Sequence, residues 1–309
     1  MRQQSPSSWA AICVLIAALV HLALGFSIEF SVDEAHYALY AQHLAWSYFD
    51  HPPLVGWIQW PLVALTSSEG VIRLIPELLW ILSGFLVYQV TIEVHHFIRG
   101  RNAGYLTSAL PSANLCGLMA VLVVIAAPML HILAIGLLPD TLLAPLSLGL
   151  MLMALRWLSK DQFSIGDWVI TGVLLGLAGL SKYTAAFTAF ALLLVFLSAP
   201  RKSWFTKAGF WLAGICALML ITPVLYWNWA NDWISFKYQL AHGSGGEWLW
   251  RRLAAYLGIQ VLVFGPLFIL GSFIFLRDCM HATKFSLLAL FGFFFIPFAI
   301  FVSLSGGGG

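Results

Sequence analysis

Charged residues are scarce in this sequence. Lys, Arg, Asp and Glu make up 9% of its 309 residues, whereas a soluble domain usually carries about 25%. This scarcity excludes a water-soluble globular fold. It also excludes a disordered chain, which combines low hydrophobicity with high charge. The chain has 15 basic and 13 acidic residues, so its net charge is small. We therefore expect no nucleic-acid partner.

Cysteine is also rare, and its few positions are scattered. The four residues are Cys13, Cys116, Cys216 and Cys279. Each lies in or beside an apolar run, without the spacing of metal ligands or of a disulfide framework. We therefore expect them to be small buried hydrophobic residues.

Long apolar runs dominate what is present. Hydrophobic residues make up 61% of the chain, and the mean hydropathy is +0.90. Since a membrane-spanning helix needs roughly 20 apolar residues, the sequence predicts an all-α, polytopic transmembrane helical bundle with about nine spans. The runs lie near residues 9–28, 71–94, 103–127, 141–158, 168–181, 184–199, 208–229, 253–276 and 284–304. The fifth and sixth runs form either a tight helical pair or one long broken helix, and the first is expected to be an uncleaved anchor.

The placement of charges predicts the orientation. If the N-terminus is cytoplasmic, ten of the basic residues fall on the cytoplasmic side, as the positive-inside rule requires. These are Arg2, Arg99, Arg101, Arg156, Lys160, Arg201, Lys202, Lys207, Arg277 and Lys284. Acidic residues then collect on the opposite face.

Residues 29–70 form the longest predicted non-spanning segment, the first outer loop. Within Asp33–Trp46, small and apolar residues recur at helical spacing, which predicts an amphipathic helix lying at the membrane interface. The stripe consists of Ala35, Ala38, Leu39, Gln42 and Ala45. Tryptophans and other aromatic residues follow, as in the aromatic belt at headgroup level.

Carboxylates beside a bilayer are costly, so each is a candidate site residue. Asp33 and Glu34 follow the first span directly, and a carboxylate there could accept a proton from a hydroxyl or an amine. The alternative is that both only complement the positive end of a helix. Asp50 and His51 precede two prolines that stiffen the backbone, although the same pattern also describes a simple turn.

Asp140 and Lys182 complete the candidates on the predicted outer face. Asp140 follows a proline, where it either caps the next span or shares a site with Asp33. The Lys182 side chain either extends to the interface or binds a phosphate, as basic pockets bind lipid headgroups. We expect the histidines in or near spans to be structural, because the sequence offers them no acidic partner. They are His21, His95, His96, His131 and His281.

Five short motifs in this order carry a resemblance. They are Asp33-Glu34-Ala35-His36-Tyr37, Tyr48-Phe49-Asp50-His51-Pro52-Pro53-Leu54, Pro139-Asp140-Thr141, Leu180-Ser181-Lys182-Tyr183-Thr184 and Asn228-Trp229-Ala230-Asn231-Asp232-Trp233-Ile234-Ser235-Phe236. Together they resemble the bacterial polyprenyl-phosphate-dependent glycosyltransferases of the dolichyl-phosphate-mannose protein mannosyltransferase superfamily. This group includes lipid A aminoarabinose transferases and lipopolysaccharide-core galacturonosyltransferases. The resemblance implies one transmembrane catalytic module of the GT-C type over residues 1–309, truncated at its C-terminus relative to the family.

The resemblance also implies roles for residues. Asp33 looks like the catalytic base, and Glu34 would orient its neighbours or the acceptor. Lys182 would bind the donor phosphate, supported by His51, Arg251 and Arg252. The substrate- or acceptor-binding residues would be His36, Tyr37, Asp50 and Asp140.

Two positions depart from the family pattern. Many lipid A-modifying relatives have Glu-Lys where this chain has Asp50-His51, which suggests a different donor or acceptor. His36 replaces an arginine of some relatives. No cofactor is required by the sequence, although some relatives bind a divalent metal, for which Asp33 and Asp140 would be the ligands.

The resemblance implies an inverting transfer. A sugar would move from a polyprenyl-phosphate donor to lipid A or lipopolysaccharide, another cell-envelope glycan or a protein. The enzyme would lie in the bacterial inner membrane, with its N-terminus cytoplasmic and its active site periplasmic. A transporter or flippase of a lipid-linked or anionic substrate is the main alternative, and a non-catalytic lipid-binding assembly protein is another. No inverted repeat is visible, and the charges concentrate in outer loops rather than at the midplane.

Overall fold

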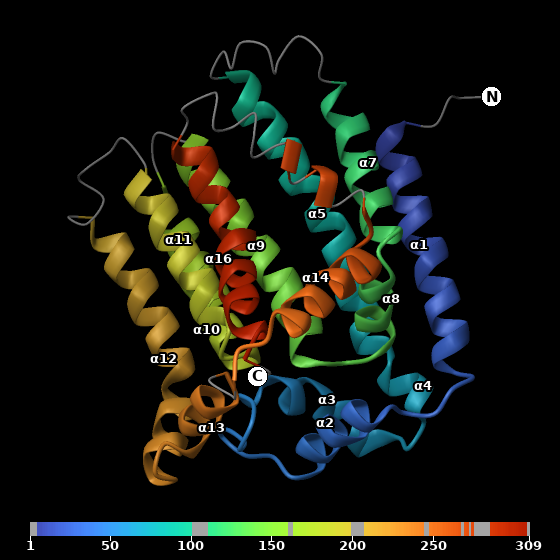
Figure 1. Ribbon diagram of the computed structural model, residues 1–309, viewed down its shortest axis with the longest axis vertical. Coiled ribbons are helices and arrows are strands. Elements are labelled where there is room, and N and C mark those ends of the chain that lie inside the picture. Colours follow the sequence, from blue (N-terminus) through green and yellow to red (C-terminus); the bar gives the residue numbers. More distant parts are fainter. Residues whose placement is uncertain are drawn as a thin grey trace.

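The computed structural model describes residues 5–100, 111–159, 163–198, 207–243, 247–266, 269–271, 273–274 and 285–307. Within these ranges every regular element is a helix (Figure 1). This confirms the all-α fold class.

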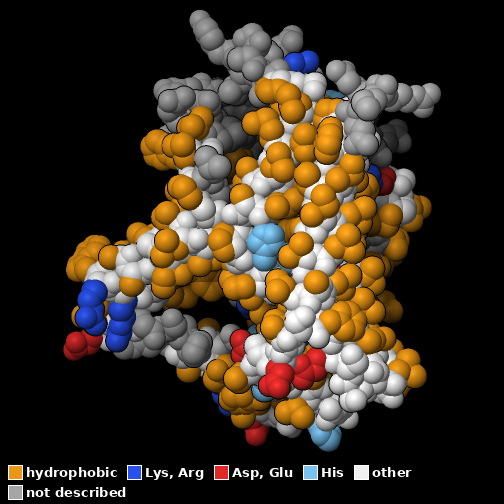
Figure 2. All heavy atoms as spheres, turned by 90° about the vertical axis from the view of Figure 1, so that its right-hand side faces the viewer, with side chains coloured by type: hydrophobic (Ala, Val, Ile, Leu, Met, Phe, Trp, Pro, Cys, Tyr) orange, Lys and Arg blue, Asp and Glu red, His pale blue; other side chains and the backbone are white. Residues whose placement is uncertain are grey.

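Four stretches of the described chain are long and apolar enough to cross a membrane. They are α1 (Pro6–Gly25), α4 (Glu69–Ile72) together with α5 (Leu74–Gly100), α9 (Pro139–Ser159) and α12 (Ala208–Ala230). Hydrophobic side chains also cover much of the outer surface of the helices, as a lipid environment requires (Figure 2). The protein is therefore a multi-pass membrane protein.

A fifth apolar stretch is bent. Helices α7 (Ala113–Ile125) and α8 (Pro128–Ile135) pass the length and hydropathy test together but meet at 77°. The break lies where Pro128 begins α8, because proline has no amide hydrogen to continue the preceding helix. The sequence predicted a span over 103–127, and in the structure the apolar stretch continues past the bend to Ile135. Residues 101–110 of that span lie outside the described residues.

Four further helices of the described chain are apolar. The predicted pair is resolved, since α10 (Ile165–Ser181) and α11 (Ala185–Ser198) are separate helices. The other two are α16 (Phe285–Ser305) and α3 (Leu54–Leu65), and α3 was not expected within the first outer loop. In the predicted span 253–276, α14 covers Trp250–Phe264, and much of the rest lies outside the described residues.

Small residues allow α10 and α12 to pack closely. A Cβ atom at Gly172 would lie 2.4 Å from the backbone oxygen of Ala213, and one at Gly176 would lie 2.7 Å from Leu220. Glycine at both positions therefore lets the two helices approach, as is common between membrane helices. This packing fixes where α10 ends, and with it the position of Lys182.

The chain segments that carry the candidate residues gather at one end of the bundle. Helices α2 (Val32–Gln42), α3, α4 and α13 (Ile234–Gly243) lie at the end opposite the start of α1 (Figure 1). Helix α2 ends four residues before the predicted Trp46. Its small and apolar stripe lines a hollow of about 640 Å³ next to α3 and α4.

Candidate active site

Asp33 is presented by a well-defined helix start. Ser31 Oγ accepts a hydrogen bond from the Glu34 amide (3.3 Å), and Glu34 Oε2 accepts one from the Ser31 amide (2.9 Å). This capping box satisfies two amides of the first turn. Asp33 lies in that turn, where the helix dipole favours an acid. Its side chain is exposed, and no polar contact holds it in the part of the chain that the structure describes.

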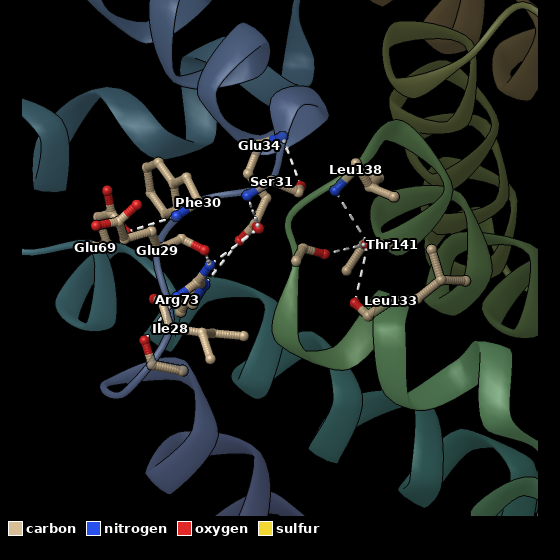
Figure 3. Close-up of polar contacts among 12 residues, drawn as sticks. Ile28, Glu29, Phe30, Ser31, Glu34, Glu69, Arg73, Leu133, Leu138 and Thr141 are labelled. Carbon is tan, nitrogen blue, oxygen red and sulfur yellow. Dashed lines mark hydrogen bonds and ion pairs between the residues drawn. The ribbon is translucent and has the colours of Figure 1, made fainter.

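Glu34 forms a buried ion pair with Arg73. Arg73 Nε lies 2.8 Å from Glu34 Oε1, and Arg73 Nη2 lies 3.0 Å from Oε2 (Figure 3). Arg73 is 2% exposed, and it also donates to the backbone oxygens of Gly25, Ile28 and Glu29. The arginine thus joins the start of α5 to the segment that leads into α2. These contacts favour a positioning role for Glu34, and its membership of a catalytic pair stays a prediction.

Asp50 is the centre of a polar cluster beside α2. Tyr40 donates a short hydrogen bond to Asp50 Oδ1. His36 Nε2 and His51 Nδ1 lie 3.3 and 3.1 Å from Oδ2. The turn is closed by a hydrogen bond from the Tyr48 amide to the His51 oxygen (3.1 Å). Two motifs that are separate in the sequence therefore form one cluster.

The polar cluster shifts the pKa values of Asp50 and Tyr37 in opposite directions. Burial alone would raise the pKa of Asp50, but the contacts of His51 and Tyr40 and the charge of His51 outweigh it and hold this pKa well below its usual range. The pKa of Tyr37 is raised, first by burial and then by the charges of Asp50, Asp33 and Asp140. Asp50 is accordingly a stable anion and Tyr37 a neutral hydroxyl.

Asp140 and Lys182 form an ion pair across two helices. Lys182 Nζ lies 2.8 Å from Oδ1 and 2.6 Å from Oδ2 of Asp140. The turn before Asp140 is closed by Thr141, whose hydroxyl accepts from the Leu138 amide and lies 3.0 Å from the oxygens of Leu133 and Gly136 (Figure 3). The Lys182 ammonium group is therefore held by Asp140, and the lysine side chain is 24% exposed.

The part of the site formed by α2 and Asp50 contacts the part formed by Asp140 and Lys182. A Cβ atom at Gly136 would lie 3.4 Å from Glu34 Cδ, so the turn before α9 packs against the start of α2. The charges of Asp33, Asp50 and Asp140 all act on Tyr37. The structure thus brings together eight of the ten predicted residues: Asp33, Glu34, His36, Tyr37, Asp50, His51, Asp140 and Lys182.

The comparison with protein families decides the identity. The sequence profile described as dolichyl-phosphate-mannose-protein mannosyltransferase matches residues 50–227, from Asp50 past Lys182. The chain belongs to this family. The resemblance inferred from the five motifs is thereby confirmed.

Two further comparisons agree with the family. The chain is 27% identical over 249 residues to the lipid A galacturonosyltransferase RgtD of Rhizobium johnstonii, covering 77% of this chain and 47% of that protein. Crystal structures of ArnT from Cupriavidus metallidurans, apo and bound to undecaprenyl phosphate, match with a TM-score of 0.65 at 20% identity. They cover 96% of this chain and 55% and 56% of ArnT. The family member described here shares the ArnT fold and spans about half the length of these relatives.

Arg251 and Arg252 do not join the site. Both are exposed on α14. Arg252 Nη1 lies 3.2 Å from the backbone oxygens of Glu247 and Gly307, and no contact in the described ranges links either arginine to Asp33 or Lys182. The structure therefore gives no support to their predicted role as phosphate ligands.

The Asp33–Asp140 pair does not fit a metal ion. Both carboxylate oxygens of Asp140 face the Lys182 ammonium group, which repels a cation. The described residues also contain no group of three or more His, Cys, Asp and Glu side chains placed to hold one.

Two groups were missed in the sequence. Arg73 is the one basic residue of the apolar run 71–94, which is a signal of a buried partner. His21 was expected to have no acidic partner, yet its Nδ1 lies 2.9 Å from Glu77 Oε1 and its Nε2 2.7 Å from His131 Nδ1. These three residues come from α1, α5 and α8, and sequence spacing does not reveal such a contact.

Proposed function

We propose that this protein is an integral-membrane glycosyltransferase, or the part of one that contains its catalytic residues. It moves a sugar from a polyprenyl-phosphate donor to an acceptor in the cell envelope. The named relatives support lipid A as the acceptor class, since RgtD is a lipid A galacturonosyltransferase. ArnT has been crystallised with undecaprenyl phosphate, which supports a donor of that lipid type.

One observation carries the proposal. The uncommitted carboxylate of Asp33 lies at the same end of the bundle as the Asp50–His51 and Asp140–Lys182 pairs. A sugar phosphate needs both a base for the acceptor and a cation for the leaving group. Asp33 is the one acid of this set without a polar partner among the described residues, and Lys182 supplies the cation.

The chemistry follows as a single displacement. Asp33 takes the proton of an acceptor hydroxyl or amine, whose oxygen or nitrogen forms a bond to the anomeric carbon of the sugar. The bond from that carbon to the phosphate oxygen breaks, and the electron pair stays on the polyprenyl phosphate. Lys182 stabilises the added negative charge, with His51 as a second contact. Attack opposite the leaving phosphate inverts the anomeric carbon.

The topology belongs to the same proposal. Residues 1–309 form one catalytic module of about nine spans in the bacterial inner membrane, with the N-terminus in the cytoplasm. Residues 29–70 form the first periplasmic loop, in which α2 lies at the interface. Single cysteines at exposed Val32 and at exposed Ser5 should be labelled by a membrane-impermeant maleimide from opposite sides of the membrane. Labelling of both from one side would contradict this orientation.

A transfer assay tests the function. Vesicles containing the protein are supplied with labelled polyprenyl-phosphate sugars and with lipid A, comparing wild type with Asp33→Asn. Since general-base catalysis contributes about 10²–10⁴-fold, Asp33→Asn should lose that much activity with an unchanged melting temperature. Glu29→Gln is the matched control, because Glu29 is exposed and contacts Arg73 only through its backbone oxygen. Full activity of Asp33→Asn would refute the base, and lipid transport without transfer would favour a flippase.

A further inference from the structure

The Asn228–Phe236 motif has no role in the chemistry above, yet its structure is unusual. Asp232 and Trp233 have φ angles of 55° and 58°, a left-handed conformation that side chains other than glycine rarely adopt. Two such residues in a row reverse the chain after α12. The Trp233 amide donates to the backbone oxygen of Asn228 (2.7 Å), which closes the reversal.

Asn228 holds this turn from inside. It is 0% exposed. Its Nδ2 donates to the Val224 oxygen (3.1 Å) and lies 3.3 Å from the Tyr183 hydroxyl, while its Oδ1 accepts from the Ser235 amide (3.3 Å). The amide is therefore satisfied on both sides, which stabilises a backbone that would otherwise be unfavourable. The turn sets the direction in which α13 leaves α12.

Helix α13 leads back onto the segment that carries Asp50. Ser235 Oγ donates to the Tyr48 oxygen (2.9 Å), and Gln239 Nε2 donates to the Asp50 oxygen (2.7 Å). Ser235 and Gln239 are four residues apart and so lie on one face of α13. The two carbonyl groups are two residues apart in an irregular segment. In addition, the rings of Phe49 and Tyr238 lie 4.6 Å apart.

We propose that α13 is a clamp on residues 47–51, and that Ser235 and Gln239 are positioning residues for Asp50 and His51. Neither side chain contacts the Asp50 carboxylate. Both bind the backbone that presents it, while Tyr40 and His36 of α2 contact the carboxylate from another direction. The Asp50–His51 pair is thus held between two helices that are separated by about 190 residues in the sequence.

The consequence for catalysis rests on the proposed function. If His51 contacts the donor phosphate, loosening its backbone should weaken donor binding. A hydrogen bond to a charged group contributes about ten- to a hundredfold to binding. Loss of the clamp should therefore weaken binding of the lipid phosphate and leave the folding of the bundle unchanged.

The test compares the double variant Ser235→Ala/Gln239→Leu with wild type. Asn231→Ala is the matched control, because Asn231 is exposed in the same turn and its side chain bonds only the Trp227 oxygen of its own helix. Three quantities are measured in detergent: the Kd for undecaprenyl phosphate, the amide exchange of residues 46–52, and the melting temperature.

The double variant should bind undecaprenyl phosphate at least about tenfold more weakly than wild type. Its amides in residues 46–52 should exchange faster, and its melting temperature should equal that of Asn231→Ala. Unchanged exchange would overturn the clamp. Faster exchange with an unchanged Kd, or weaker binding with an equally lowered melting temperature, would overturn the positioning role. If wild type itself does not bind the lipid phosphate, the proposed donor fails, and the exchange measurement alone still decides the clamp.

Discussion

Arg73 and Glu34 are 39 residues apart in the sequence and form a two-point ion pair inside the protein, with N–O distances of 2.8 and 3.0 Å. The pair connects the start of α5 to the first turn of α2. The neighbouring residue in that turn is Asp33, so the geometry of the proposed base depends on a contact that carries no chemistry of its own.

Replacing Arg73 tests this dependence. Arg73→Met should lower the free energy of unfolding by about 3–5 kcal/mol, because it leaves the buried Glu34 charge without a partner. Three backbone oxygens also lose their donor. Thermal unfolding in detergent measures the effect. The double variant Arg73→Met/Glu34→Leu should recover part of the loss, and a single variant as stable as wild type would contradict the argument.

The ionised carboxylate of Asp50 should stabilise the fold, and this stabilisation should be lost in acid. Its pKa is depressed below the ordinary 3.8, so the stabilisation is complete above that value and is lost as the pH falls towards the lower folded-state pKa. Tyr40→Phe removes one hydrogen bond to the carboxylate and should make the decline below about pH 4 shallower. Melting temperatures across this range check it. Tyr226→Phe, at an exposed residue, is the control and should keep the wild-type slope.

The contacts among Glu77, His21 and His131 predict that two substitutions of Glu77 have different effects on stability. Glu77→Gln retains an amide that can bond the His21 ring, so stability should change little. Glu77→Leu removes the carboxylate that lies 2.9 Å from the buried His21 ring, and the loss of this polar neighbour should cost about 1–3 kcal/mol. Thermal unfolding of both variants provides the measurement. Glu93→Leu on the same helix controls for the loss of an acid, and equal effects at position 77 would refute these contacts.

The Lys182–Asp140 pair predicts opposite effects of its two members on lipid phosphate binding. Lys182→Met removes the cation and leaves Asp140 to repel the phosphate, so the Kd for undecaprenyl phosphate should rise about ten- to a hundredfold. Asp140→Asn frees the ammonium group and should bind as tightly as wild type or more tightly. Fluorescence titration measures both constants. Weaker binding in Asp140→Asn than in Lys182→Met would exclude Lys182 as the phosphate ligand.

Local features were readable from the sequence. Apolar runs predicted the all-α membrane class, because a run of roughly 20 apolar residues has few other stable environments. The order of the acidic motifs predicted the family and the residues that meet at one end of the bundle. The sequence also predicted a helix that begins near Asp33, and the structure adds the Ser31–Glu34 capping box at its start.

The tertiary structure decided which partner each charge has. Glu34 faces Arg73, Lys182 faces Asp140, His21 faces Glu77, and Gln239 reaches the Asp50 backbone. None of these pairs has a fixed spacing along the chain. The sequence by itself determined which side chains were too polar to remain unpaired beside lipid, whereas only the packing of helix ends determined their partners, because a buried charge is stabilised by whichever opposite group the fold places within about 3 Å.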